Sequence, residues 1–107
     1  MKSPTIDAMC SALGLPPPRS EYRFAAPRKW RFDWAWPHPY CIALEVQGGL
    51  FSGGRHVRGA ALLKEHEKLN AAAIRGWRLL YCTPKQFESG EALVWVAEAV
   101  MHMERQG

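Results

Sequence analysis

The spacing of hydrophobic residues changes several times along the chain, and each change predicts a new element. Residues 4–13 carry apolar side chains at helical spacing, with Ser3 as a cap and Pro4 at the first helical position. Gly14 and the run Pro16-Pro17-Pro18 end this helix and favour an extended link. Residues 1–20 are therefore expected to form an N-terminal helix and a proline-rich connector.

Alternating aromatic and polar residues predict strands in the next part of the chain. Segments 21–24 and 29–36 have this pattern, and Ala25-Ala26-Pro27-Arg28 between them is typical of a hairpin turn. The apolar run 40–47 is closed by two glycines and predicts a central, buried strand. Three strands are expected in succession.

A glycine-rich basic loop, 50–59, precedes the clearest helical pattern of the chain. Helical spacing runs from 62 to 74, where Gly76 suits a C-terminal cap, and its members are Leu62, Leu63, His66, Leu69, Ala73 and Ile74. Residues 77–82 predict a fourth strand, and Thr83-Pro84 predicts the start of a helix that continues from 92 to 103. The expected order is α-β-β-β-α-β-α, an α/β fold with a four-stranded mixed sheet flanked by helices.

Length and composition fit one globular domain covering residues 1–107. The chain is 48% hydrophobic, which supplies one core, and its formal net charge of +4 favours anionic partners. Cys10, Cys41 and Cys82 lack the paired spacing of a disulfide framework or a zinc site, so we expect a reducing cytoplasm. No apolar run is long enough to span a bilayer, and we expect no membrane association.

Two acids in the predicted strands are the candidate chemistry. Strand periodicity places Asp33 on one face of the second strand and Glu45 on one face of the third, so the two carboxylates can meet at one edge of the sheet. Glu45 interrupts an apolar strand, and a buried charge needs a partner. A metal ion between the carboxylates would provide it; a salt bridge to Arg31 or Arg23 is the structural alternative.

The motifs around these acids resemble the PD-(D/E)XK nuclease superfamily. Asp33 and Glu45-Val46-Gln47 match its acidic pattern, and residues 21–83 are similar to small phage and prophage nucleases of the VRR-NUC type, which are related to Holliday-junction resolvases. The segments that carry the similarity are Glu21-Tyr22-Arg23-Phe24, Arg28-Lys29-Trp30-Arg31-Phe32-Asp33, Glu45-Val46-Gln47-Gly48-Gly49 and Glu67-Lys68-Leu69-Asn70, followed by Gly76-Trp77.

The resemblance implies a restriction-endonuclease-like core and a Mg²⁺-dependent endonuclease acting on DNA, with a preference for branched structures. Asp33, Glu45 and the carbonyl of Val46 would bind the Mg²⁺, and Mn²⁺ should substitute. The resemblance also implies a homodimer, because cutting both strands requires two sites. The expected setting is the cytoplasm of a bacterial or phage-infected cell.

Gln47 departs from the resemblance, which places a lysine at this position more often than a glutamine. Glutamine orients water but brings no charge, and some restriction enzymes that resemble this family also carry it. Lys64 or Lys68, one helical turn apart, could supply the missing cation. Glu21 is the candidate for an additional upstream acid. We therefore expect Asp33, Glu45, Gln47, Glu21 and Lys68 to take part in catalysis.

Contacts to DNA are expected from basic residues after the third strand: Arg55, His56, Arg58 and Lys64. A solvated loop without a ligand is the alternative for the first three. The five tryptophans are expected to pack in the core or at a dimer interface. Two other classes of function stay open: a DNA-binding module that has lost its chemistry through Gln47, and a structural protein without DNA affinity.

Overall fold

A computed structural model describes residues 5–47 and 60–106, the side chains of 60, 61 and 106 excepted. The elements in chain order are α1 (Ile6–Ala12), β1 (Arg19–Arg23), β2 (Arg31–Trp36), β3 (Ile42–Val46), α3 (Ala60–Ile74), β4 (Arg78–Cys82), α4 (Pro84–Glu88) and α5 (Glu91–Gln106). The predicted loop 50–59 lies outside the described residues. Among the helices described, none has the length and apolar character that crossing a membrane requires.

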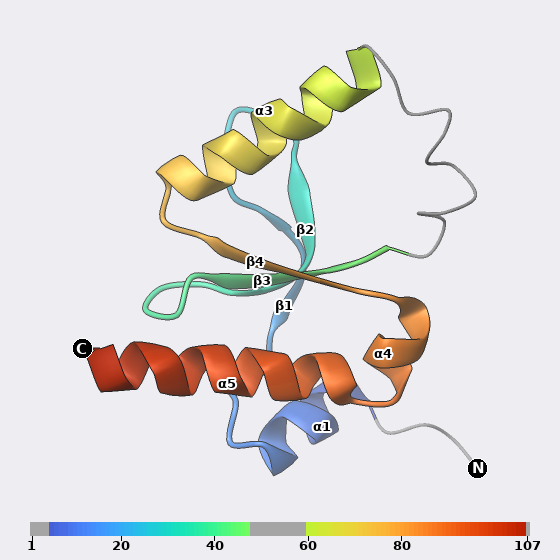
Figure 1. The fold of residues 1–107 in the computed structure, drawn as a ribbon, viewed down its shortest axis with the longest axis vertical. Helices are drawn as coiled ribbons and strands as arrows, with labels where there is room; N and C mark the ends of the chain where they lie inside the picture. Colours follow the sequence, from blue (N-terminus) through green and yellow to red (C-terminus); the bar gives the residue numbers. More distant parts are fainter. Residues whose placement is uncertain (1–4, 48–59, 107) are drawn as a thin grey trace.

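The four strands form one mixed sheet in the order β1-β2-β3-β4 (Figure 1). β1 and β2 form an antiparallel hairpin, β2 and β3 are also antiparallel, and β3 and β4 are parallel. A parallel pair needs a crossover, which the segment containing α3 supplies. The predicted α/β class and four-stranded mixed sheet are therefore confirmed.

Helices cover both faces of the sheet, with α3 on one side and α1 and α5 on the other (Figure 1). The alternation of β3 explains this arrangement: Ile42 and Leu44 pack into the core shared with α5, whereas Ala43 faces the smaller core that contains Ala72 of α3. β3 is buried almost throughout, as predicted for a central strand. The α5 core also holds Trp36, whose indole N–H donates to the carbonyl of Pro16 in the connector.

The helix ends are set by local hydrogen bonds and by glycine. Thr5, rather than Ser3, caps α1 through its side-chain oxygen. Thr83 and Gln86 form a capping box at the start of α4, where a helix start was predicted. The single C-terminal helix expected from the sequence is wrong: Gly90 has a φ of +87° and separates α4 from α5. A left-handed residue cannot continue a right-handed helix, so the chain bends there.

The apolar residues that predict α3 are not those that α3 turns toward the sheet. Leu62, Leu63 and Ile74 are exposed, whereas Ala72 is buried against the sheet. Ala72 meets two other small residues, Ala35 and Ala43, so the helix backbone approaches the strands closely. This rotation of the helix places polar residues of α3 over the sheet.

Candidate functional site

Asp33 and Glu45 meet where the hydrogen-bond ladder between β2 and β3 stops. The last ladder pair on this side is Trp34 with Leu44, so Asp33 and Glu45 occupy the next opposed positions. Asp33 Oδ2 accepts the backbone N–H of Val46 at 2.8 Å, and Glu45 Oε2 accepts the backbone N–H of Asp33 at 3.1 Å. The two carboxylates thus replace backbone acceptors, and each is fixed to the partner strand.

Lys68 of α3 completes this group from above the sheet. Its ammonium donates a hydrogen bond to Glu45 Oε1 and forms an ion pair with it. The two side chains are only 17% and 9% exposed, which shields the pair from solvent. Lys68 Nζ also lies 5.9 Å from the centre of the Phe32 ring, within cation–π range.

Burial is the largest influence on the pKa of Glu45. Desolvation raises the pKa of its carboxyl above the ordinary value of 4.5, although the hydrogen bonds from Lys68 and from the Asp33 backbone act in the opposite direction. The negative charge of Asp33 adds to the increase. Glu45 is therefore a carboxylate that needs positive charge beside it in order to stay ionised.

Two further residues, which the sequence did not single out, lie on this side: Tyr81 next to Glu45, and Glu65 close enough to affect Tyr81. Tyr81 is the register partner of Glu45 on β4, and burial together with the charges of Glu65 and Glu45 raises the pKa of the Tyr81 phenol. Glu65 and Lys68 are three positions apart on α3 and Ala72 is one turn further on, so helical spacing places all three on one side of the helix. Starting from Ala72 in place of the leucines would have identified this side.

The other predicted catalytic residues have different positions. Glu21 has a φ of +49° and forms an exposed ion pair with Arg31 at 3.6 Å, so its carboxylate is directed to that arginine. Gln47 directly follows β3 and is half-buried; its backbone N–H donates to the carbonyl of Cys82 at 2.8 Å. Lys68, not Lys64, contacts Glu45.

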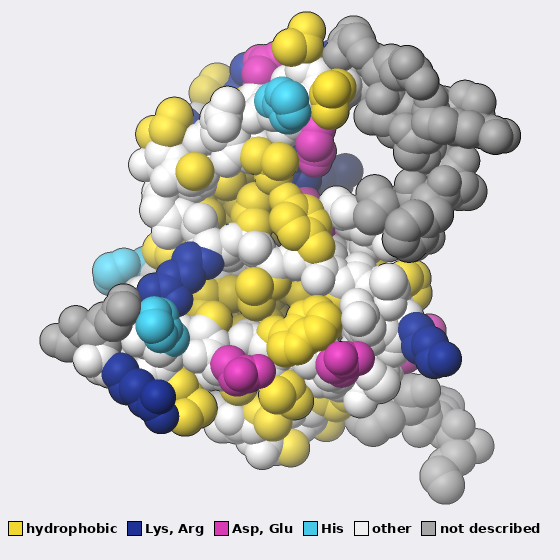
Figure 2. Space-filling view, viewed as in Figure 1, with side chains coloured by type: hydrophobic (Ala, Val, Ile, Leu, Met, Phe, Trp, Pro, Cys, Tyr) yellow, Lys and Arg dark blue, Asp and Glu magenta, His cyan; other side chains and the backbone are white. Residues whose placement is uncertain are grey.

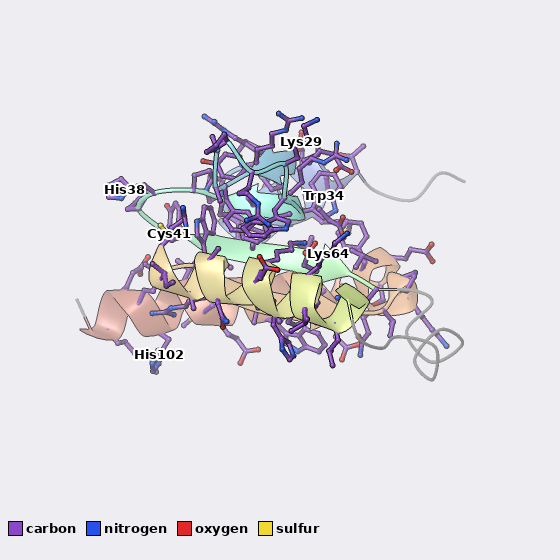
Figure 3. The ribbon with its side chains drawn as sticks, turned by 90° about the horizontal axis from the view of Figure 1, so that it is seen from above. Lys29, Trp34, His38, Cys41, Lys64 and His102 are labelled. Carbon is purple, nitrogen blue, oxygen red and sulfur yellow. The ribbon has the colours of Figure 1, made fainter. Side chains whose placement is uncertain are left out.

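The predicted DNA contacts are only partly described. Lys64 lies on α3, one turn before Lys68, and is exposed (Figure 3). Arg55, His56 and Arg58 lie outside the described residues.

Two expectations about the acids need correction. The site is not on an edge of the sheet: β2 and β3 are the two inner strands, with β1 and β4 outside them. The structural alternative named the wrong cation, because Arg31 pairs with Glu21 while Lys68 pairs with Glu45. Long-range packing of α3 selects Lys68, and strand periodicity alone gives no information about it.

The donor set of this site suits a hard cation only in part. The two carboxylates are oxygen donors of the kind Mg²⁺ prefers, and the Val46 carbonyl, the third expected ligand, belongs to the residue whose N–H binds Asp33. Within residues 5–47 and 60–106, no cluster of three or more His, Cys, Asp or Glu side chains is placed to hold a metal ion. A Mg²⁺ ion held by Asp33 and Glu45 alone would need water to complete its coordination, and Lys68 would have to share Glu45 with the ion.

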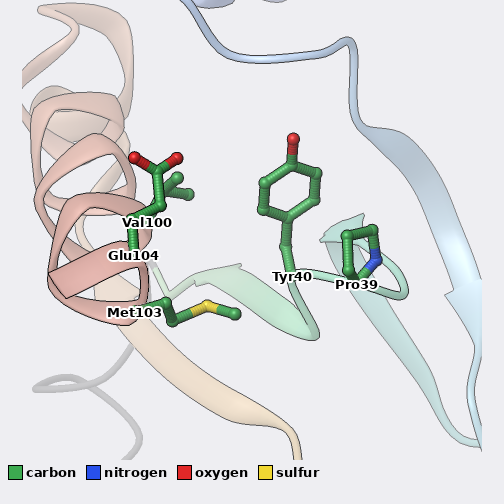
Figure 4. Close-up of a pocket in the computed structure, with 5 residues that line it drawn as sticks. All are labelled: Pro39, Tyr40, Val100, Met103 and Glu104. Atoms are coloured by element: carbon green, nitrogen blue, oxygen red, sulfur yellow. The ribbon is translucent and has the colours of Figure 1, made fainter. Parts of the chain in front are cut away.

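Two surface clefts of the described residues lie on another part of the molecule. A cleft of about 280 Å³ separates the turn before β3 from α5 and is lined by Pro39, Tyr40, Val100, Met103 and Glu104 (Figure 4). A second, of about 290 Å³, follows the outside of α5. Neither includes Asp33, Glu45 or Lys68; Lys68 belongs to α3, and Glu45 contacts it on the side of the sheet that α3 covers.

Compared with known protein families, with characterised proteins and with solved structures, the chain matches none.

Proposed function

We propose that this protein is a Mg²⁺-dependent DNA endonuclease with a restriction-endonuclease-like core and a preference for branched DNA such as four-way junctions. The observation that carries the proposal is the convergence of Asp33, Glu45 and Lys68 from β2, β3 and α3. Neighbouring carboxylates repel each other unless positive charge lies beside them, which Lys68 supplies in part, and a lysine there suits a negatively charged substrate. The resemblance to the PD-(D/E)XK nucleases accounts for the same three residues.

Four residues of the chain would have separate roles in the reaction. Asp33 and Glu45 hold Mg²⁺, which would activate a water molecule and neutralise charge on the phosphate. Lys68 places positive charge next to Glu45, in the role that the resemblance assigns to a lysine at position 47. The amide of Gln47, directly after β3, would orient the attacking water by accepting its proton in a hydrogen bond.

A second candidate is a DNA-binding module without nuclease activity. The ion pair of Lys68 with Glu45 favours it, because the pair neutralises the buried carboxylate without a metal ion. In the described part of the chain, every buried side-chain nitrogen and oxygen already has a hydrogen-bond partner. Such a self-sufficient group could have a purely structural role.

Cleavage assays separate the two candidates. Purified protein is incubated with plasmid, linear duplex, flap, four-way junction and single-stranded DNA, with Mg²⁺, with Mn²⁺ and with EDTA. We expect metal-dependent cleavage that Asp33→Asn and Glu45→Gln each reduce by about 10²-fold or more, since each removes several kcal/mol of transition-state stabilisation. Glu88→Gln removes an exposed carboxylate on α4 and is the matched control.

The outcome assigns the function. Cleavage that survives both substitutions would exclude this site as the catalytic centre. Binding of DNA without cleavage under any of these conditions would favour the DNA-binding module. Cleavage of four-way junctions in preference to duplex, with a dimer in solution by sedimentation, is the result that the endonuclease proposal expects.

A further inference from the structure

The basic charge of the protein is concentrated in the β1–β2 hairpin. Five of the fourteen lysines and arginines lie between residues 19 and 31, with Glu21 as the single acid there. They are Arg19, Arg23, Arg28, Lys29 and Arg31. By contrast, residues 84–107 contain two basic and four acidic residues, and Figure 2 shows acidic side chains along the α5 side. The hairpin alone therefore carries a formal charge equal to the +4 of the whole chain.

All five basic side chains of the hairpin are exposed. Two of them have acidic partners: Arg28 pairs with Glu67 of α3 at 3.5 Å, and Arg31 pairs with Glu21. These pairs are more than half exposed, and surface pairs of this kind contribute little to stability. The cations therefore remain available to an external anion. Figure 3 shows Lys29 and His102 of α5 on opposite sides of the molecule.

Arg23 and Arg31 are directly opposite each other across the β1–β2 ladder. Side chains at opposed positions have Cβ atoms about 5 Å apart, and two like charges there destabilise the hairpin. The neighbouring pair, Tyr22 and Phe32, packs into the core under α3, whereas both arginines are exposed. An arrangement that costs stability in the free protein becomes favourable when a polyanion lies against it.

Protection of an exposed sheet edge is the competing explanation for these charges. β1 is an edge strand, and lysine or arginine on an edge strand prevents unwanted pairing with other chains. This explanation accounts for Arg19 and Arg23. It does not account for Arg31, which lies on the inner strand β2, or for Lys29 in the segment before it.

We infer that the outward face of the β1–β2 hairpin, with Arg23, Lys29 and Arg31 at its centre, binds the phosphate backbone of DNA. The inference rests on the proposed function, because it identifies the surface that would bring DNA to that site. Arg31 precedes Asp33 by two residues on β2, which is roughly 7 Å along a strand. DNA bound to these exposed side chains would therefore contact the strand that carries Asp33.

The test measures DNA binding without cleavage. Fluorescence anisotropy of a labelled duplex and a labelled four-way junction is recorded in EDTA at several salt concentrations. The triple variant Arg23→Gln/Lys29→Gln/Arg31→Gln is compared with wild type, and Lys85→Gln/Arg105→Gln on the α4–α5 side is the charge control. Loss of three phosphate contacts should reduce the slope of log Kd against log salt by about 2 to 3, and weaken binding on the order of tenfold or more at moderate salt.

Each outcome has a defined meaning. The inference is overturned if the triple variant keeps the wild-type affinity and salt slope, if the control loses as much affinity, or if wild type binds no DNA but binds vesicles containing phosphatidylserine. Self-association of a triple variant that still binds DNA would show that the charges protect the edge. The triple variant could lose DNA binding while the control keeps it and wild type never cleaves DNA. In that case the hairpin binds DNA as inferred, and the nuclease proposal fails. Thermal unfolding should show the triple variant to be about as stable as wild type, because relief of the Arg23–Arg31 repulsion offsets the loss of the exposed Arg31–Glu21 ion pair.

Discussion

Asp33 and Glu45 are tied to each other's strands by two side-chain hydrogen bonds at the point where the β2–β3 ladder ends. Asp33 accepts from the backbone of Val46, and Glu45 accepts from the backbone of Asp33. The carboxylates therefore have a structural role before any chemical one. Substitutions that test catalysis must keep this role, and this condition determines which variants are informative.

The first prediction separates the two roles of Asp33. Asp33→Ala removes the acceptor for the Val46 N–H and should cost about 1–3 kcal/mol of unfolding free energy, since a part-buried donor loses its partner. Asp33→Asn keeps an oxygen acceptor and should cost clearly less. Urea unfolding of both variants measures the difference. Equal destabilisation would show that the hydrogen bond is unimportant to the fold.

The second prediction concerns the pH dependence of stability. Because burial raises the pKa of Glu45, the folded protein binds this proton more tightly than the unfolded chain. The stability that this carboxyl contributes is fully present below pH 4.5 and is lost as the pH rises through the folded pKa. Lys68→Met removes the hydrogen bond and charge that oppose the increase, so the pKa of Glu45 should rise further.

Lys68→Met should therefore destabilise the protein little at about pH 4 and by about 3 kcal/mol at about pH 8, where Glu45 must be ionised without its partner. Thermal and urea unfolding across this range provide the measurement. Lys85→Met, an exposed lysine on α4, is the control and should change stability equally little at every pH. A pH-independent loss in Lys68→Met would mean that the lysine contributes through packing alone.

The third prediction tests metal binding without relying on activity. A cation that binds only the folded protein stabilises it by about 1.4 kcal/mol at ten times its Kd, roughly 5 °C or more in Tm for a domain of this size. Mg²⁺ and Mn²⁺ should raise the Tm of wild type at neutral pH, and should not raise that of Asp33→Asn or Glu45→Gln.

Lys68→Met provides the sharper comparison, because Lys68 and a metal ion compete for Glu45. This variant should gain more from Mg²⁺ than wild type does. If neither Mg²⁺ nor Mn²⁺ raises the Tm of wild type or of Lys68→Met, Lys68 and Glu45 form a structural ion pair. This result would favour the DNA-binding module.

The sequence predicts the strands well because their side chains point alternately to the two faces of the sheet, a pattern with a period of two residues. The faces of β3 follow directly: Ala43 and Glu45 point to α3, and Leu44 points to α5. The meeting of Asp33 with Glu45 follows from that alternation and from the hairpin order. Side chains that replace ladder hydrogen bonds could not be predicted, since they depend on where the β2–β3 pairing stops.

The orientation of α3 shows what a local pattern cannot supply. Leu62, Leu63 and Ile74 have the spacing of a buried face, yet the helix packs through Ala72. The small residues Ala35 and Ala43 on the sheet make this close approach possible, and they lie far from the helix in sequence. The same rotation selects Lys68 over Lys64, a choice that helical periodicity left open.

The last prediction asks whether Lys68 supplies the charge that Gln47 lacks. If it does, Lys68→Met should reduce cleavage by about 10²-fold at a metal concentration that saturates both proteins, as expected for the loss of one electrostatic contact in the transition state.

Adding Gln47→Lys to that variant returns a cation next to the same carboxylates, because position 47 follows Glu45 by two residues. The double variant should therefore recover at least about tenfold of the lost kcat, whereas Gln47→Lys in the wild-type background should change kcat little. Adding Lys85→Met to Gln47→Lys is the matched control and should behave as Gln47→Lys alone. The double variant could fold and bind Mg²⁺ without recovering kcat. That result would show that Lys68 acts by positioning Glu45 and not by stabilising negative charge on the phosphate.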